Sequence, residues 1–323
     1  MSEGTPAREG TPVTGLSPDA ARAAVARVAG SASGAVGLAA RHLETGETLT
    51  WHADDRFSTA SMIKVPIHAA VLRRSRLGAF AMDDEVEVRE SDHAGGSGVL
   101  AELRPGLRCT VSDLCTLMIV VSDNTATNML VDLCGGVAAV NDDFAALGFP
   151  GFRLNRKISI PPPPLAAMRP PEVPGGPAPS GPLATVTLTD FCELMAGLHA
   201  GSVVDEKASA EIVTVMRYQQ HQALFPRAYL AVAIPFHPPG QDSPGLAHKT
   251  GYVGGCRTDA GLLLLPGGGT VAYAAAADGL ADRTMTALAE GDEILGRLGA
   301  IVLARWWPGP GPVPVRDGWL PAG

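Results

Sequence analysis

Ser61-Met62-Ile63-Lys64 opens a segment, residues 61–74, whose pattern predicts a helix that is apolar at its start and basic at its end. Pro66 limits where this helix begins, because proline is tolerated only in the first turn, where no backbone N–H is needed for the helix. The helix is therefore expected to begin very near Ser61. Since residues three apart share one face of a helix, Ser61 and Lys64 should point the same way.

Two further motifs follow along the chain, Ser122-Asp123-Asn124 and Lys249-Thr250-Gly251. Taken alone, the first motif is typical of a capped helix with a solvated lysine, the second of a turn between helices, and the third of a strand end. Their occurrence together and in this order indicates a single catalytic site.

These residue types suit acyl transfer. A serine hydroxyl is a weak nucleophile, so Ser61 needs a base within hydrogen-bond reach. Lys64 can be that base only if burial or a nearby positive charge keeps it partly deprotonated, and Lys249 can supply the charge. Lys249 also offers, together with Thr250, a clamp for a substrate carboxylate. Gly251 would let the substrate lie against its strand.

The remaining motif residues have expected roles in proton transfer and orientation. Ser122 is a candidate proton shuttle, and Asn124 can orient either Lys64 or a substrate amide. The start of a helix directs the backbone N–H of Ser61 to where a developing oxyanion can be held.

The rest of the pattern alternates between strands and helices. Strands are predicted over residues 35–42, 48–51, 246–249, 260–265 and 271–277. Helices are predicted from a cap at Ser17, as three linked helices over 111–147, from Thr187 to about His199, and from Ala281 to Trp306. A strand pair, a helical block, a strand trio and a closing helix favour an α+β domain with the first and last helices on the sheet.

One domain is expected over residues 17–307, with polar or Pro-rich tails at 1–16 and 308–323. The sheet lobe would comprise about 17–58 and 225–307, and the helical lobe about 59–224. Within the helical lobe, prolines crowd residues 158–182, which excludes a helix or an inner strand and predicts a loop.

Composition limits the partners and the compartment. The formal net charge of −8 argues against a nucleic-acid partner. No apolar stretch approaches the ~18 to 20 residues needed to cross a membrane, so no membrane partner is expected. The first residues show no secretory signal, which predicts a cytoplasmic protein. The sequence leaves the oligomeric state open.

No metal or cofactor is expected. The cysteines are odd in number and lack metal-ligand spacing, which predicts reduced, buried thiols at Cys109, Cys115, Cys134, Cys192 and Cys256. No metal-binding arrangement of the HExxH type is formed by His93, His221, His237 and His248. In an alternating strand His248, directly before Lys249, would point away from the site.

From Phe57 to about Asp278 the chain resembles the class A β-lactamase family of serine penicillin-recognising enzymes. Besides the three motifs, the resemblance rests on residues 96–100, on residues 117–130, and on Gly255, Arg257 and Asp259. It implies an α/β sandwich like that of DD-peptidases and β-lactamases: a five-stranded antiparallel sheet flanked by terminal helices, and an all-helical lobe.

The resemblance also implies roles for individual residues. Ser61 would be the acylated nucleophile, in a site between the two lobes. The N–H of Tyr252 would be the second donor to the oxyanion. Arg257 would be either an extra cation for a substrate carboxylate or part of a structural ion pair.

The chain departs from the family where the acyl-enzyme is cleared. Ile158 stands where class A β-lactamases carry the glutamate that activates water, and Pro162 stands where they carry an asparagine. The nearest acid further on is Glu172, inside the Pro-rich stretch. A disulfide of some relatives is also excluded, because His68 stands where a partner for Cys115 would be.

These departures predict a β-lactamase-like serine acyl enzyme, that is, an esterase, amidase or acyltransferase. It would act at Ser61 on a small natural-product or metabolic intermediate, with poor turnover of β-lactams. The expected substrate bears a carboxylate, which the clamp of Lys249 and Thr250 would hold. Three alternatives remain open. They are a genuine class A β-lactamase that uses Glu172 or another residue, a penicillin-binding sensor that acylates once, and a serine glutaminase, which the Lys249 motif disfavours.

Overall fold

The computed structural model describes residues 15–160, 181–228, 244–265, 268–286 and 288–307. Almost all of the predicted N-terminal tail, the whole C-terminal tail, Glu172, and most of the Pro-rich stretch lie outside these ranges.

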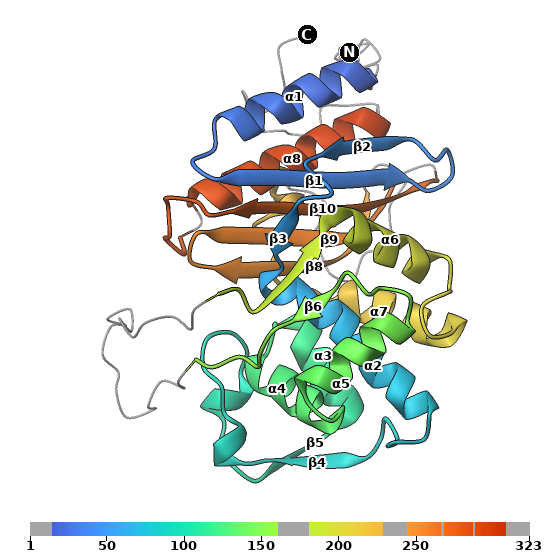
Figure 1. Ribbon diagram of the computed structural model, residues 1–323, viewed down its shortest axis with the longest axis vertical. Coiled ribbons are helices and arrows are strands. Elements are labelled where there is room, and N and C mark those ends of the chain that lie inside the picture. The colour runs from blue at the N-terminus through green and yellow to red at the C-terminus, as the bar shows by residue number, and fades with distance from the viewer. Residues whose placement is uncertain (1–14, 161–180, 229–243, 266–267, 287, 308–323) are drawn as a thin grey trace, which may run out of the picture.

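A five-stranded antiparallel sheet forms the upper part of the molecule in Figure 1, in the order β2-β1-β10-β9-β8. Its strands are β1 (Ala35–His42), β2 (Thr48–Trp51), β8 (Gly245–Val253), β9 (Cys256–Leu264) and β10 (Thr270–Asp278). The predicted strands and the predicted fold class are confirmed, and the three C-terminal strands are longer than expected. The strand that carries Lys249-Thr250-Gly251, β8, is an edge strand, so one of its sides is unpaired within the sheet.

Helices cover both faces of this sheet (Figure 1). On one face lie the terminal helices α1 (Pro18–Gly30) and α8 (Glu290–Trp306), with a core that includes Leu38, Tyr273 and Leu298. On the other face α6 (Leu188–His199) packs on β9 and β10. Both faces of β10 are closely covered because its run Ala274–Ala277 is wholly buried and offers only small side chains.

The last helix is shorter than its prediction, because α8 begins at Glu290 and not at Ala281. The preceding residues favour helix by composition, but side chains hold their backbone in another conformation. The carboxylate of Asp282 accepts hydrogen bonds from the N–H groups of Thr284 (2.9 Å) and Glu290 (2.8 Å). Arg257 also donates to the Thr284 carbonyl oxygen (2.6 Å), which removes that acceptor from a helix.

The second lobe is built of helices around α2 (Lys64–Arg76), which follows the short 3₁₀ helix η1 (Ala60–Ile63). Pro66 is the third residue of α2, within the first turn as predicted. The three linked helices are confirmed as α3 (Val111–Val120), α4 (Asn124–Leu133) and α5 (Val137–Ala146), and α7 (Glu206–Met216) also packs on α2.

Two small sheets and three further 3₁₀ helices complete the fold. They comprise β3 (Arg56–Ser58), β7 (Ala184–Thr187) and β6 (Arg153–Leu154) in one sheet, β4 (Glu85–Val88) and β5 (Leu107–Thr110) in the other, and the helices η2 (Glu90–Asp92), η3 (Leu100–Glu102) and η4 (Phe225–Ala228). Because β3 contacts β10 and leads directly to η1, it connects the sheet lobe to the start of the site.

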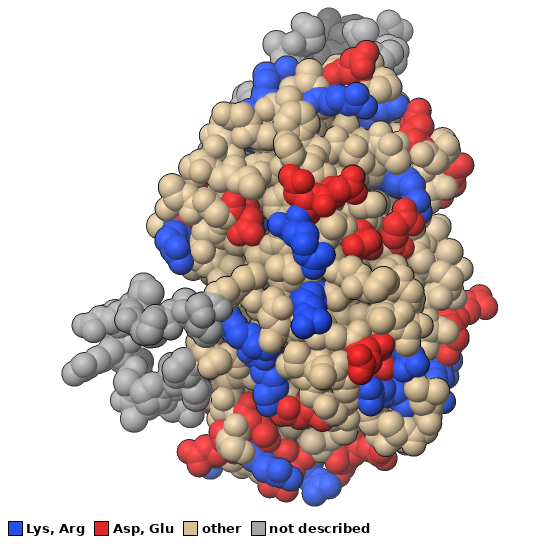
Figure 2. All heavy atoms as spheres, in the orientation of Figure 1, with Lys and Arg blue, Asp and Glu red and all other residues tan. Residues whose placement is uncertain are grey.

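The charged surface and the cysteines can be compared with what the composition predicted. On the face shown in Figure 2, acidic and basic side chains are interspersed. All five cysteines are free and buried, as predicted. Among the helices of the described residues, none is long and apolar enough to span a membrane.

Candidate active site

Lys64, the first residue of α2, is completely buried where the two lobes meet. Its Nζ donates hydrogen bonds to the Ser122 carbonyl oxygen (2.6 Å), the Ser122 Oγ (3.0 Å) and the Asn124 Oδ1 (2.8 Å). Burial holds the pKa of Lys64 well below 10.5, and the charge of Lys249 lowers it further. Lys64 therefore loses its proton more readily than an exposed lysine, which favours a role as a general base.

Ser61 is the second residue of η1, is half-buried, and precedes Lys64 by one turn. The residue before it, Ala60, has a φ of 42°, so the chain bends sharply into η1. The start of η1 is tied to the sheet because Thr258 Oγ1 donates to the Thr59 carbonyl oxygen (2.9 Å). This anchor places Ser61 beside the edge strand β8.

Gly251 permits that close approach. A Cβ at this position would lie 2.2 Å from Thr258 Oγ1 and 2.9 Å from the Ser61 backbone nitrogen. Both distances are too short for real carbon contacts, so a side chain here would push β8 away from Ser61. The geometry explains why a glycine must follow Lys249 and Thr250.

Ser122 lies between α3 and α4 with a φ of 57°, a left-handed conformation that is uncommon for a residue with a side chain. Asp123 fixes this loop. Its Oδ1 accepts from the Ala126 N–H (2.9 Å) at the start of α4, and its Oδ2 accepts from the N–H groups of Val99 (2.6 Å) and Leu100 (2.9 Å). No role was predicted for Asp123, although a capping residue directly before a helix is a recognisable signal.

The amide of Asn124 is held at both ends. Its Oδ1 accepts from Lys64, and its Nδ2 donates to the Gly95 carbonyl oxygen (2.8 Å). Ser97, a residue that sequence reasoning did not single out, donates from Oγ to the Ser122 carbonyl oxygen (2.7 Å). Asn124 thus orients Lys64, which is one of its two expected roles.

Lys249 and Thr250 lie side by side on β8, and both are buried. Lys249 Nζ donates to the Thr250 carbonyl oxygen (2.7 Å). Burial lowers the pKa of Lys249 to about 7, and Asp259 partly opposes this effect. Within the described residues the Thr250 hydroxyl is buried without a hydrogen-bond partner.

Arg257 is not brought to the site. It lies on the opposite face of the sheet, where its Nε pairs with Asp292 (2.6 Å) and its other nitrogens donate to the carbonyl oxygens of Val253 (3.1 Å), Cys256 (3.0 Å) and Thr284 (2.6 Å). The guanidinium is buried and committed to these acceptors. Of the two roles expected for Arg257, the structural ion pair is the one that the described residues show.

His248 also points away from the site, as an alternating strand requires. Its Nδ1 lies 2.9 Å from Asp259 Oδ1, which also accepts from the hydroxyl of Tyr273 (3.0 Å). All three side chains are buried. The carboxylate of Asp259 is therefore occupied behind the strand that carries Lys249.

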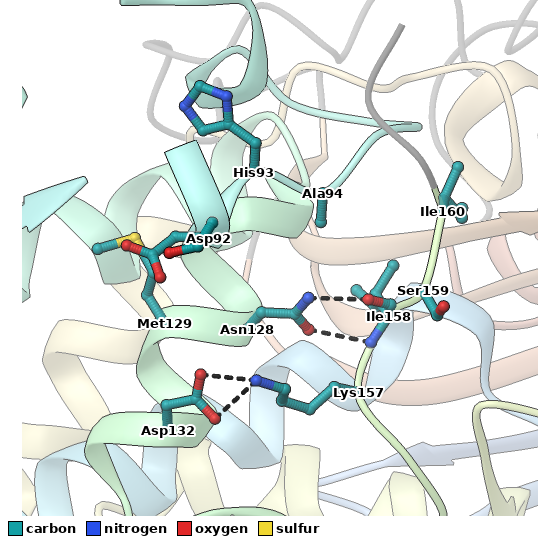
Figure 3. A pocket seen from close by; sticks show the side chains of 11 residues that line it. Asp92, His93, Ala94, Asn128, Met129, Asp132, Lys157, Ile158, Ser159 and Ile160 are labelled. Carbon is teal, nitrogen blue, oxygen red and sulfur yellow. Dashed lines mark hydrogen bonds and ion pairs between the residues drawn. The ribbon is translucent and has the colours of Figure 1, made fainter. Parts of the chain in front are cut away.

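Ile158 lies beside α4, at the edge of the described residues. The Asn128 side chain brackets its backbone, with Oδ1 accepting from the Ile158 N–H (2.9 Å) and Nδ2 donating to its carbonyl oxygen (2.8 Å) (Figure 3). Lys157 pairs with Asp132 one turn further along α4 (2.7 Å). The residues in these contacts line a pocket of about 460 Å³. The contacts hold the main chain of Ile158 and do not involve its side chain.

His221 approaches the site from the segment after α7. From the sequence it was examined only as a possible metal ligand. Gln219 Nε2 donates to the Ile119 carbonyl oxygen (2.8 Å), and the Gln220 N–H donates to the Val120 carbonyl oxygen (3.1 Å). These two bonds bring the next residue, His221, to the end of α3, close to Val121 and Ser122. No spacing rule could have found this residue, because only the fold brings the segment to the end of α3.

Comparisons with known proteins agree with this geometry. The family described as "Beta-lactamase enzyme family" matches residues 20–306. A protein named "Beta-lactamase" from Rhodobacter capsulatus is 34% identical over 156 residues, which are 48% of this chain and 51% of that protein, so the match spans about half of that relative.

Solved structures match over nearly the full fold. The structure of a β-lactamase from Sphaerobacter thermophilus is 31% identical with a TM-score of 0.73, covering 89% of this chain and 97% of that one. A class A β-lactamase from Mycobacterium abscessus, 23% identical with a TM-score of 0.71 over 88% of this chain and 98% of that one, shares the fold. The resemblance inferred from the motifs is confirmed: the chain belongs to the β-lactamase enzyme family.

Proposed function

We propose that this protein is a serine acyl enzyme in which Ser61 attacks a substrate carbonyl and carries the acyl group. The observation that supports this most directly is the state of Lys64, a buried lysine whose pKa is lowered and whose Nζ is held by Ser122 and Asn124. Burying a lysine is costly and does little to stabilise a fold. A general base one turn after a serine, by contrast, needs a lowered pKa and a fixed Nζ.

In the first half-reaction, neutral Lys64 takes the proton of the Ser61 hydroxyl while Oγ bonds to the carbonyl carbon. The oxyanion is held by the backbone N–H groups of Ser61 and Tyr252. When the bond to the leaving group breaks, Ser122 gives that group a proton and regains one from Lys64, to which its Oγ is already hydrogen-bonded.

The substrate proposed is a small molecule with a carboxylate. Lys249 offers a buried cation, and the buried Thr250 hydroxyl offers a donor that no described residue uses. Both groups lie on the edge strand beside Ser61, so they can hold a carboxylate near the reacting carbonyl.

We further propose that release of the acyl group is slow for β-lactams, because the side chain of Ile158 cannot accept a proton from an attacking water. The preferred substrate would then be an ester or amide of a natural-product or metabolic intermediate, with transfer to water or to another acceptor. The names of the relatives favour a second candidate, a genuine β-lactamase that clears its acyl-enzyme by another route.

A chromogenic cephalosporin separates these candidates. We expect a burst of one colour change per Ser61, followed by slow turnover, and an intact mass increased by one acyl group. Ser61→Ala should abolish both signals, and Ser112→Ala, an exposed serine on α3, should retain them. Rapid multiple turnover would establish the second candidate, and an adduct in Ser61→Ala would refute the assigned nucleophile.

A further inference from the structure

An acyl-enzyme is released only if something accepts the proton of the incoming nucleophile. Ile158 cannot, and the two carboxylates nearest the motifs are already engaged. Asp123 accepts three backbone N–H groups, and Asp259 lies behind β8 against His248 and Tyr273. Among the described residues, the proton acceptor is therefore to be sought in the basic groups beside the Ser122 loop and the edge strand β8.

His221 lies between the two motif-bearing walls of the site. Gln219 and Gln220 fasten its segment to the last residues of α3, which lead into Val121 and the Ser122 loop. The same ring lies 6.0 Å, centroid to centroid, from that of Tyr252, the residue after Lys249-Thr250-Gly251. It thus spans from the Ser122 loop to the edge strand.

The state of the ring suits a base. His221 is exposed, so a nucleophile from solvent can reach it. Its pKa lies below 6.5, because of partial desolvation first and the charge of Lys249 second, with smaller effects from His248 and Lys64 in the same direction. The neutral ring has one N–H donor and one nitrogen whose lone pair can accept a proton.

We propose that His221 is the proton acceptor for the second half-reaction, activating a hydroxyl-bearing acceptor, water or an alcohol, that enters from the solvent side of the cleft. This inference rests on the proposed acylation of Ser61 and adds the residue that ends it.

In this second half-reaction the acceptor oxygen bonds to the acyl carbonyl carbon while its proton passes to the free nitrogen of His221. The tetrahedral intermediate then collapses, the bond from carbon to Ser61 Oγ breaks, and Oγ takes up the proton that His221 accepted, relayed through solvent water. His221 returns to its neutral form, and Lys64 stays neutral, as the first half-reaction left it.

The test follows the acyl-enzyme alone. The full-length protein is acylated with benzylpenicillin or p-nitrophenyl acetate, excess reagent is removed, and the decay of the adduct is followed by intact mass. We expect His221→Ala and His221→Gln to form the adduct at the wild-type rate but to lose it about 10- to 100-fold more slowly. Added imidazole should accelerate decay in His221→Ala only, a rescue that a structural role would not give. His199→Gln, an exposed histidine at the end of α6, is the matched control.

The outcomes separate the two proposals. If no reagent acylates Ser61, the proposed function fails and this inference fails with it. If the adduct forms but decays equally fast in wild type and both His221 variants, or if the wild-type adduct never decays, only the role of His221 is overturned.

Discussion

The Nζ of Lys64 and the Oδ1 of Asn124 lie 2.8 Å apart, in a contact between the first residue of α2 and the first residue of α4. Both side chains are buried, so little water competes for this hydrogen bond. Because a neutral amide orients the lysine without adding charge, Asn124 leaves the lowered pKa of Lys64 intact.

Asn124→Asp tests this relationship. A carboxylate beside Lys64 should raise the pKa of the lysine, so the rate of Ser61 acylation should fall by at least about 10-fold at pH 7 and recover partly at higher pH. The measurement is the burst rate with a chromogenic cephalosporin from pH 6 to about 10. Asn128→Asp, the same substitution one turn further along α4, does not touch Lys64 and should leave the pH profile in place. An unshifted profile in Asn124→Asp would contradict the role given to Lys64.

The titration of Lys249 should make the affinity for a carboxylate substrate depend on pH. Its pKa of about 7 means that it is protonated at lower pH and increasingly neutral at higher pH. A carboxylate is attracted only by the protonated form, so the KM of a carboxylate substrate should rise above pH 7, by up to about 10-fold per pH unit. The methyl ester of the same substrate is the control, and its KM should change little. Parallel profiles for acid and ester would show that Lys249 does not bind the carboxylate.

Ile158→Glu should supply a proton acceptor at the position where the family carries one. Since Asn128 holds the main chain of residue 158 at both its N–H and its carbonyl oxygen, the new side chain should not displace the loop. We expect the acyl-enzyme formed with benzylpenicillin to decay at least about 10-fold faster, as measured by intact mass. Ile158→Gln has the same size without a basic oxygen and should show no such gain. Equal acceleration by both variants would indicate a packing effect.

Gly251→Ala should damage the site directly. The added Cβ would meet Thr258 Oγ1 and the Ser61 backbone nitrogen, so acylation should be lost, and stability should fall by about 1 to 3 kcal/mol as is usual for overpacking. Urea unfolding and burst kinetics measure the two effects. At Gly254, three residues on, an added Cβ has ordinary contacts at 3.6 Å and beyond, so Gly254→Ala should retain both. A fully active Gly251→Ala would contradict the close approach of β8 to Ser61.

The buried side chain of His68 should make the stability of the fold decrease at acidic pH. It is buried in α2, and neither ring nitrogen has a hydrogen-bond partner within the described residues. Burial lowers its pKa to about 4. As the pH falls from 6.5 to about 4, the unfolded chain binds a proton that the folded chain does not, so the free energy of unfolding should drop by on the order of 3 kcal/mol.

The substitution His68→Leu should remove this drop and raise stability at pH 5. The measurement is urea unfolding at several pH values, with the exposed residue His199 changed to Leu as the control. If His68→Leu and wild type lose stability equally on acidification, the titration of His68 is not the cause.

Local sequence signals predicted much of the fold and the centre of the site. The motif residues Ser61, Lys64, Ser122 and Lys249 stand at element boundaries or on an edge strand, where capping residues, proline and glycine mark the chain. The strands of the sheet were also recognisable, because their alternation and their turns are encoded locally. The start of α8 was predicted wrongly, because the contacts of Asp282 and Arg257 that prevent helix before Glu290 join distant parts of the sequence.

Residues that act through long-range contacts escaped prediction for the same reason. Arg257 could be either a substrate contact or a structural cation, and only the position of Asp292 on α8 distinguishes them. His221 approaches Ser122 because Gln219 bonds to the end of α3, a pairing across about a hundred positions that no local pattern contains. Composition could not show which face of the sheet each of these side chains occupies.

The buried cysteines have a practical consequence for chemical labelling. Burial raises the pKa of every one of the five thiols, in two cases to about 12, so reactive thiolate is scarce in the native protein. Electrophilic probes that normally modify serine and cysteine alike should therefore find little competition from sulfur here. A fluorescent β-lactone or fluorophosphonate could serve as an active-site titrant, with its stoichiometry reporting the fraction of correctly folded molecules.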